Sequence, residues 1–219
     1  MNTICITNRA LSQRPFFQQL GIVASADPKA ILLREKDQQI EEYTNTACKA
    51  ITICHTFNIS CLLHSLNLPP ENYLFDLLSD CEEGIISADG IQMTMRDFLW
   101  MKANLPAELL SNLKRQGFRV GVSTHSVEEA VLCEKNDADY VTASHIFPTA
   151  CKKNLAPRGL VYLQSVCRAV NLPVYALGGI QEDNAASCLK AGASGVCVMS
   201  LCMQQDAKRR IEALVNMPD

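Results

Sequence analysis

The sequence has no long apolar run and no excess of positive charge, and both absences exclude classes of protein. No window approaches the roughly 18 continuous apolar residues that a membrane-spanning helix needs. Residues 1–15 contain no basic stretch ahead of an apolar one, so no secretion signal is indicated. The formal net charge of −3 supplies no positive field for a polyanion. We therefore expect neither nucleic acid nor a membrane surface as a partner.

The sequence also lacks the cysteine spacing of a disulfide scaffold or a zinc site. Its 11 cysteines are odd in number and scattered, and no Cys-x-x-Cys pair occurs. Cys5, Cys61 and Cys197 lie inside apolar runs, where a free thiol behaves as a small hydrophobic side chain. The interval between Cys61 and His64 alone does not make a zinc site. Reduced thiols in a cytoplasmic protein fit this pattern best.

No low-complexity tract or linker divides the 219 residues, of which 48% are hydrophobic, so we expect one domain with a sizeable core. Short apolar runs with β-branched residues recur along the chain, and their weak alternation is typical of strands buried on both faces. Eight such runs are found, at residues 3–7, 30–34, 60–64, 90–93, 119–123, 139–143, 174–177 and 195–199.

Helical patterns separate most of these runs. They cover residues 37–56, 106–116, 126–136, 159–170, 182–191 and 206–215. Two of them stop at Gly117 and Gly192, which suit a left-handed residue after a helix. Helix and loop are both compatible with residues 12–29 and 67–88. Because eight consecutive βα units most economically close into a barrel, we predict a single-domain α/β fold, a (β/α)8 TIM barrel over residues 1–219.

In such a barrel the chemistry gathers at the carboxyl ends of the strands. His125 follows the fifth run, and an imidazole can both accept and return a proton near neutral pH, although a packed or helix-capping histidine also fits this position. Ser126 can cap the acidic helix that follows. Other polar residues at the same edge are candidates for substrate binding: Arg34, Lys36, Gln92, Ser123, Thr149 and Lys152.

Several of these residues also have a structural interpretation. Arg34 and Glu35 are equally compatible with an ion pair, and Asp97 fits better as the start of a helix. His145 fits better as a structural residue of a loop, and only one of the adjacent Lys152 and Lys153 is expected to face the site.

The seventh run ends in Gly178 and Gly179, and the eighth ends near Ser200. Paired glycines let backbone amides approach an anion, and the loops after the last two barrel strands are the usual phosphate site. A tight turn needs glycine anyway, but the position after the seventh run favours the functional interpretation. We expect Gly178, Gly179 and Ser200 to bind a phosphate.

With these motifs the sequence resembles the thiamine phosphate synthase and TenI group of (β/α)8 barrels. The similarity is clearest over residues 121–200, and LREK at residues 33–36 is similar to the family's second-strand motif. The matching segments are GVSTHSVEEA, ADYVTASHIFPTACKKNLAPRG, PVYALGGI and GASGVCVMS. Together they cover somewhat over half of the chain.

The resemblance implies one of two reactions of thiamine biosynthesis. Thiamine phosphate synthases join a pyrimidine diphosphate to a thiazole phosphate and need Mg²⁺ held by acidic residues, from an Asn-Asp pair after strand three and a His-x-Gly-Gln-x-Asp motif after strand four. Here the third run leads into His64, Ser65 and Leu66, and after the fourth only Asp97 keeps its place. One carboxylate is a poor magnesium site.

The loop at residues 145–159 instead resembles the TenI branch, whose activity is thiazole tautomerase. That reaction aromatises a carboxythiazole phosphate by a proton shift from a ring carbon to the exocyclic carbon. His125 matches the family's catalytic histidine. The resemblance therefore implies an isomerase without metal or cofactor, a small phosphorylated thiazole as substrate, and a dimer or larger assembly. Asn154 and Leu201 depart from glycines that are common in the family.

Two alternatives stay open. One is a Mg²⁺-dependent thiamine phosphate synthase with altered metal ligands. The other is a barrel that binds thiazole or thiamine phosphates as a regulator, without converting them.

Overall fold

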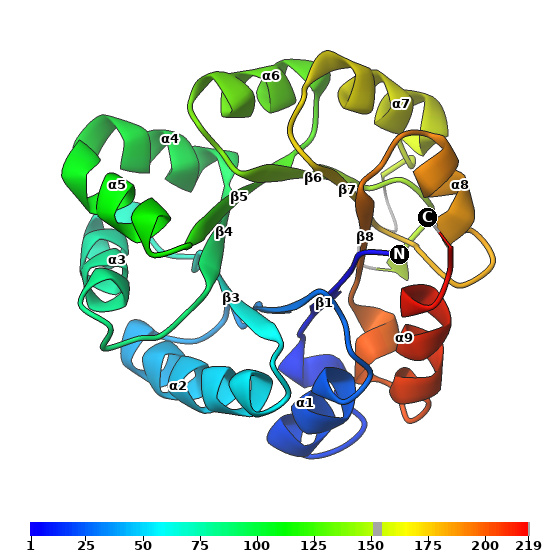
Figure 1. Cartoon of the computed structure of the whole chain (residues 1–219), viewed down its shortest axis with the longest axis horizontal. Helices are drawn as coiled ribbons and strands as arrows, with labels where there is room; N and C mark the ends of the chain where they lie inside the picture. Colours follow the sequence, from blue (N-terminus) through cyan, green and yellow to red (C-terminus); the bar gives the residue numbers. More distant parts are fainter. Residues whose placement is uncertain (151–154, 219) are drawn as a thin grey trace.

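The computed structural model describes residues 1–150 and 155–218. Its eight strands are parallel and form a closed barrel in chain order, with β1 paired to β8 (Figure 1). The strands are β1 Thr3–Ile6, β2 Ala30–Leu33, β3 Ser60–His64, β4 Gly90–Thr94, β5 Arg119–Thr124, β6 Tyr140–Ser144, β7 Val174–Leu177 and β8 Gly195–Val198. Each lies within a residue or two of a predicted run. The predicted (β/α)8 TIM barrel is confirmed.

A ring of helices surrounds the strands (Figure 1). The helices are α1 Phe16–Ala24, α2 Ile40–Thr56, α3 Leu74–Glu82, α4 Met95–Asn104, α5 Ala107–Arg115, α6 Val127–Lys135, α7 Gly159–Ala169, α8 Ala185–Lys190 and α9 Ala207–Val215, with short 3-10 turns at η1 Arg9–Leu11, η2 Pro70–Asn72 and η4 Ser200–Met203. All six predicted helices are present. The helices α1 and α3 occupy the two segments where helix and loop both fitted the sequence, and α4 lies where the sequence predicted only a helix start at Asp97.

The helix ends follow the predicted local chemistry. The Ser126 hydroxyl accepts a hydrogen bond from the Glu129 backbone N–H at 3.1 Å and caps α6. The Thr94 hydroxyl accepts from the Asp97 N–H at 3.2 Å and caps α4. Gly117 and Gly192 have φ values of +90° and +101°, so both glycines leave the helix in the left-handed region.

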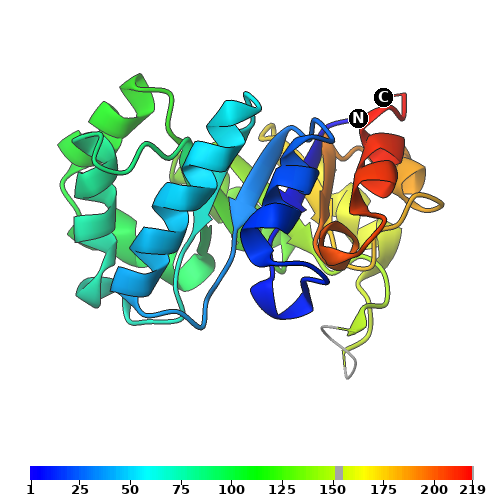
Figure 2. The same cartoon turned by 90° about the horizontal axis from the view of Figure 1, so that it is seen from below.

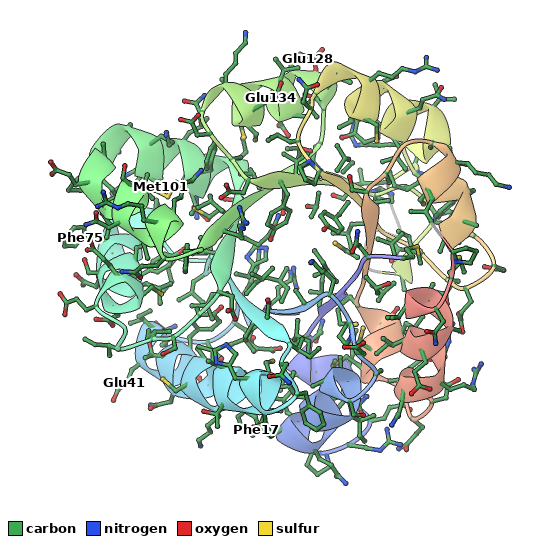
Figure 3. All side chains as sticks on the ribbon, in the orientation of Figure 1. Phe17, Glu41, Phe75, Met101, Glu128 and Glu134 are labelled. Carbon is green, nitrogen blue, oxygen red and sulfur yellow. The ribbon has the colours of Figure 1, made fainter. Side chains whose placement is uncertain are left out.

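Side chains of alternate strand residues fill the inside of the barrel, and the others pack against the helices (Figure 3). The inner layer is apolar, and it contains Ile4, Ile6, Ala30, Leu32, Leu62, Tyr140, Tyr175 and Cys197. The two tyrosine rings meet edge to face, with their centroids 5.7 Å apart. This layer closes the barrel below the carboxyl ends of the strands, so a cavity can form only above it.

The two ends of the chain lie side by side at one end of the barrel (Figure 2). The Met1 ammonium group donates hydrogen bonds to the backbone oxygens of Val215 and Met217, at 2.9 and 2.8 Å. None of the helices in the described residues is long and apolar enough to cross a membrane.

Candidate active site

A cavity of 520 Å³ opens at the carboxyl ends of the strands, a size that suits a small-molecule ligand. The structure places nine of the ten predicted site residues on its lining: Arg34, Lys36, Gln92, Ser123, His125, Thr149, Gly178, Gly179 and Ser200. The tenth, Lys152, lies outside the described residues, as does Asn154. The roles assigned to these residues stay predictions, but the residues come from six different strand ends to one cavity.

His125 follows β5 and carries an exposed ring at the cavity wall. Its backbone N–H donates to the Glu129 carboxylate at 2.6 Å, which fixes the strand end against the first turn of α6. The ring Nδ1 lies 3.2 Å from both the backbone oxygen and the hydroxyl of Ser144. Within residues 1–150 and 155–218, the ring Nε2 has no hydrogen-bond partner, so it is available to a ligand.

The turn after β7 consists of two glycines, which carry no side chains. Gly178 and Gly179 have φ values of +105° and +67°, which favour glycine. A Cβ on Gly178 would collide with His145, and a Cβ on Gly179 would collide with the Pro148 backbone oxygen and with Phe147. The turn is therefore pressed against the loop that follows β6, and its backbone lies open to the cavity.

Asn184 holds this turn from the other side. Its Nδ2 donates to the Gly179 backbone oxygen at 3.0 Å, and its Oδ1 accepts from the Gln181 N–H at 2.9 Å. The loop after β6 adds a bond from the Phe147 N–H to the Gly178 oxygen at 3.0 Å. A rigid backbone turn at this end of a barrel suits a phosphate group.

Cationic side chains line the opposite part of the cavity. Arg34 and Lys36 follow β2, and Arg96 lies in the first turn of α4. Burial, together with the neighbouring charge of Arg34, lowers the pKa of Lys36 to about 8, while Asp97 opposes the shift. A bound anion would relieve this repulsion, so the cluster favours an anionic ligand group.

Polar side chains of β4, β5 and β6 line one wall of the cavity. The Gln92 amide donates to the Ser123 hydroxyl at 3.0 Å and to the Thr142 hydroxyl at 3.3 Å. Gly121 leaves the space that the Gln92 amide and the Tyr140 ring occupy. Thr142 and Ser144 also line the cavity and were not predicted as site residues. They lie two and four positions after Tyr140 on β6, so the alternation of the strand turns them inward with it.

Carboxylates do not reach the described lining of the cavity. Asp97 is fully buried and lies in the first turn of α4, near the helix start expected there, and its Oδ1 accepts from the Arg96 Nε at 2.8 Å. Glu35 accepts from the Thr7 hydroxyl at 2.7 Å and from the Arg9 backbone N–H at 3.0 Å, so its partner is not Arg34. No group of three His, Cys, Asp or Glu side chains within residues 1–150 and 155–218 could hold a metal ion. This donor set does not fit Mg²⁺.

Two further histidines line the cavity. His145 is buried after β6, with its Nε2 3.3 Å from the Leu155 backbone oxygen, which agrees with a structural role in the loop. His64, at the end of β3, was not predicted as a site residue, because a single histidine in an apolar run gives no sign of what faces it.

The family model and the curated relatives indicate one family. Residues 3–202 match the family model described as thiamine monophosphate synthase. The chain is 30% identical over 191 residues to a thiamine-phosphate synthase of Coprothermobacter proteolyticus, covering 87% of this chain and 81% of that protein. It is 37% identical over 130 residues to the thiamine-phosphate synthase of Pyrococcus furiosus, or 59% of each chain. The solved thiamine phosphate pyrophosphorylase from Pyrococcus furiosus superimposes with a TM-score of 0.74 at 25% identity, covering 98% of this chain and 93% of that one.

Proposed function

Because the chain belongs to the thiamine monophosphate synthase family, we propose that it acts in thiamine biosynthesis on a phosphorylated thiazole, as a TenI-like tautomerase that works by proton transfer. The observation that carries this proposal is the composition of the cavity wall. An accessible imidazole, a glycine turn and a cationic cluster surround one space, and the described lining contains no carboxylate.

In the proposed reaction the glycine turn after β7 binds the substrate phosphate through its backbone, beside Ser200. Arg34 and Lys36 attract a second anionic group, the carboxylate of the carboxythiazole. The imidazole of His125 then takes part in the proton transfer. The C–H bond at the ring carbon breaks, its electron pair enters the ring, and the exocyclic double bond gains a proton as the ring becomes aromatic. Electrons are only redistributed, so the reaction needs no oxidant or reductant.

The test is the conversion of the non-aromatic carboxythiazole phosphate, followed by proton NMR. We expect conversion at the same rate with Mg²⁺ and with EDTA, because no step assigned here uses the metal. A parallel reaction supplies the pyrimidine diphosphate and the thiazole phosphate and measures pyrophosphate. Binding of thiazole phosphate without tautomer conversion would sink the proposal and favour a regulatory barrel.

The second candidate is the transferase, thiamine-phosphate synthase. The names of the relatives favour it over the tautomerase, because each of the relatives described above is named for the synthase or pyrophosphorylase. Mg²⁺-dependent pyrophosphate release from the two precursors would support this candidate and overturn the metal-independent reaction.

Ligand binding should depend on pH through Lys36. With a pKa of about 8, the Lys36 side chain is charged below that pH and neutral above it. We expect the affinity for the aromatic carboxythiazole phosphate to fall severalfold between about pH 7 and about pH 9.5, since the carboxylate and the phosphate of this ligand keep their charge over this range. Calorimetric titration at each pH measures this affinity. In the control variant Lys36→Arg the guanidinium stays charged, so the decline should disappear; equal declines in both proteins would exclude Lys36 as its cause.

A further inference from the structure

His64 lies where side chains reach the cavity, at the carboxyl end of a strand. It lies at the carboxyl end of β3, pairs in register with Gln92 of β4, and is only 4% exposed, yet it lines the cavity. Because Leu62 belongs to the inner layer of the barrel, the alternation of a strand turns His64 inward too, one level above it. The ring therefore joins Gln92 among the polar side chains that line the cavity.

The contacts of His64 fix both its place and its tautomer. The Tyr43 hydroxyl from α2 lies 2.9 Å from the His64 backbone nitrogen and 3.0 Å from its backbone oxygen. The ring Nδ1 lies 2.8 Å from the backbone oxygen of Ser65, so Nδ1 carries a hydrogen and donates it. The lone pair of the neutral ring is then on Nε2, which has no hydrogen-bond partner in the described part of the chain.

The charges around His64 keep its ring neutral in the free protein. Burial lowers its pKa well below the ordinary value, and the positive charges of Lys36 and Arg34 lower it further, while the Ser65 carbonyl opposes the shift. The other charged groups at this end of the cavity are Arg96 and Asp97 of α4, which form an ion pair. A substrate anion bound to Lys36 and Arg34 would offset their charge and make His64 a stronger base only when the site is filled.

We propose that His64 is a second acid–base residue, which takes the proton from the ring carbon of the substrate while His125 delivers a proton to the exocyclic carbon. This inference rests on the proposed tautomerase function. The broken C–H bond gives its proton to Nε2 of His64 and its electron pair to the ring. The exocyclic carbon forms a new C–H bond with the proton of a protonated His125. Exchange with solvent restores both imidazoles.

The first test uses the unaltered protein and substrate deuterated at the ring carbon, in ordinary water. If His64 removes the deuteron and His125 supplies a different proton, the aromatic product contains no deuterium at the exocyclic carbon. Deuterium carried over to that carbon, detected by mass spectrometry, would mean that one residue moves the same proton, and it would overturn the proposal.

The second test is His64→Asn. The asparagine amide replaces Nδ1 as the donor to the Ser65 carbonyl and removes the nitrogen that faces the cavity. We expect kcat to fall by about 10²-fold or more with KM little changed, since general acid–base groups typically contribute about 10²–10⁴-fold. The dependence of kcat on pH should also change shape. His55→Asn is the control, because His55 lies on an exposed part of α2 beside Asp89, outside the cavity lining.

The outcomes distinguish the proposed tautomerase function from the proposed role of His64. Absence of tautomer conversion by the unaltered protein refutes the proposed function, and the role of His64 falls with it. Conversion by the unaltered protein together with wild-type kcat in His64→Asn refutes only the role of His64. If His64→Asn fails to fold, transfer of deuterium to the exocyclic carbon would still refute the role of His64, because that experiment needs no substitution.

Discussion

Replacing His125 with alanine should slow tautomer conversion by about 10²–10⁴-fold, the usual contribution of a general acid–base group. The imidazole is the accessible proton carrier of the cavity wall, and its Nε2 has no partner among residues 1–150 and 155–218. The phosphate affinity should stay nearly unchanged, because the glycine turn after β7 lies on a different strand end. Stopped-flow or NMR kinetics gives the first quantity, and calorimetry with thiazole phosphate gives the second.

The matched control is His55→Ala, which removes a histidine of similar exposure from the side of the barrel. It should convert substrate at the rate of the unaltered protein. Near-normal turnover in His125→Ala would remove His125 from the mechanism. A loss of phosphate binding equal to the loss of rate would instead make it a binding residue.

Replacing Gly179 with alanine should weaken phosphate binding roughly tenfold or more, equivalent to about 1.4 kcal/mol. The new methyl group would collide with the Pro148 backbone oxygen and with Phe147, so the turn must move away from the loop after β6. Its backbone would then no longer lie where the anion is bound.

Gly84 provides the comparison for this substitution. It also has a positive φ, +77°, but a Cβ there meets nothing within 4 Å. Gly84→Ala therefore introduces the backbone strain, about 1–3 kcal/mol of unfolding free energy, without the collision. Thermal melting should show a loss in both variants, while calorimetry should show weaker phosphate binding only in Gly179→Ala. Equal phosphate affinities in the two variants would refute the assignment of the turn.

The strands could be predicted from the sequence because parallel strands buried on both faces are apolar without interruption. A helix start was expected at Asp97, but the bounds of α4 were not predicted because its cap, Thr94, is also the last residue of β4, so strand and helix meet with no loop between them. No turn residue in the local sequence marks where the strand ends and the helix begins.

The residues of the site could be predicted where the fold alone places them, at strand ends. The hydrogen-bond and charge partners of these residues could not be predicted where they come from distant segments of the sequence. Glu35 accepts hydrogen bonds from Thr7 and Arg9, which follow β1. The pKa of His64 is lowered by Lys36 and Arg34, which follow the neighbouring strand β2. These neighbours are far apart in sequence, and only the barrel brings them together.

The pairing of β1 with β8 also constrains how the protein folds. Thr3 pairs with Val196 and Cys5 with Val198, so the last seam of the barrel joins segments almost a whole sequence apart. Closing so long a loop costs conformational entropy before any contact is gained, and such non-local pairing slows folding. During synthesis the segment with Arg34 and His64 leaves the ribosome well before the glycine turn. The cationic half of the cavity is thus made first, and a complete pocket exists only once the eighth strand has been added.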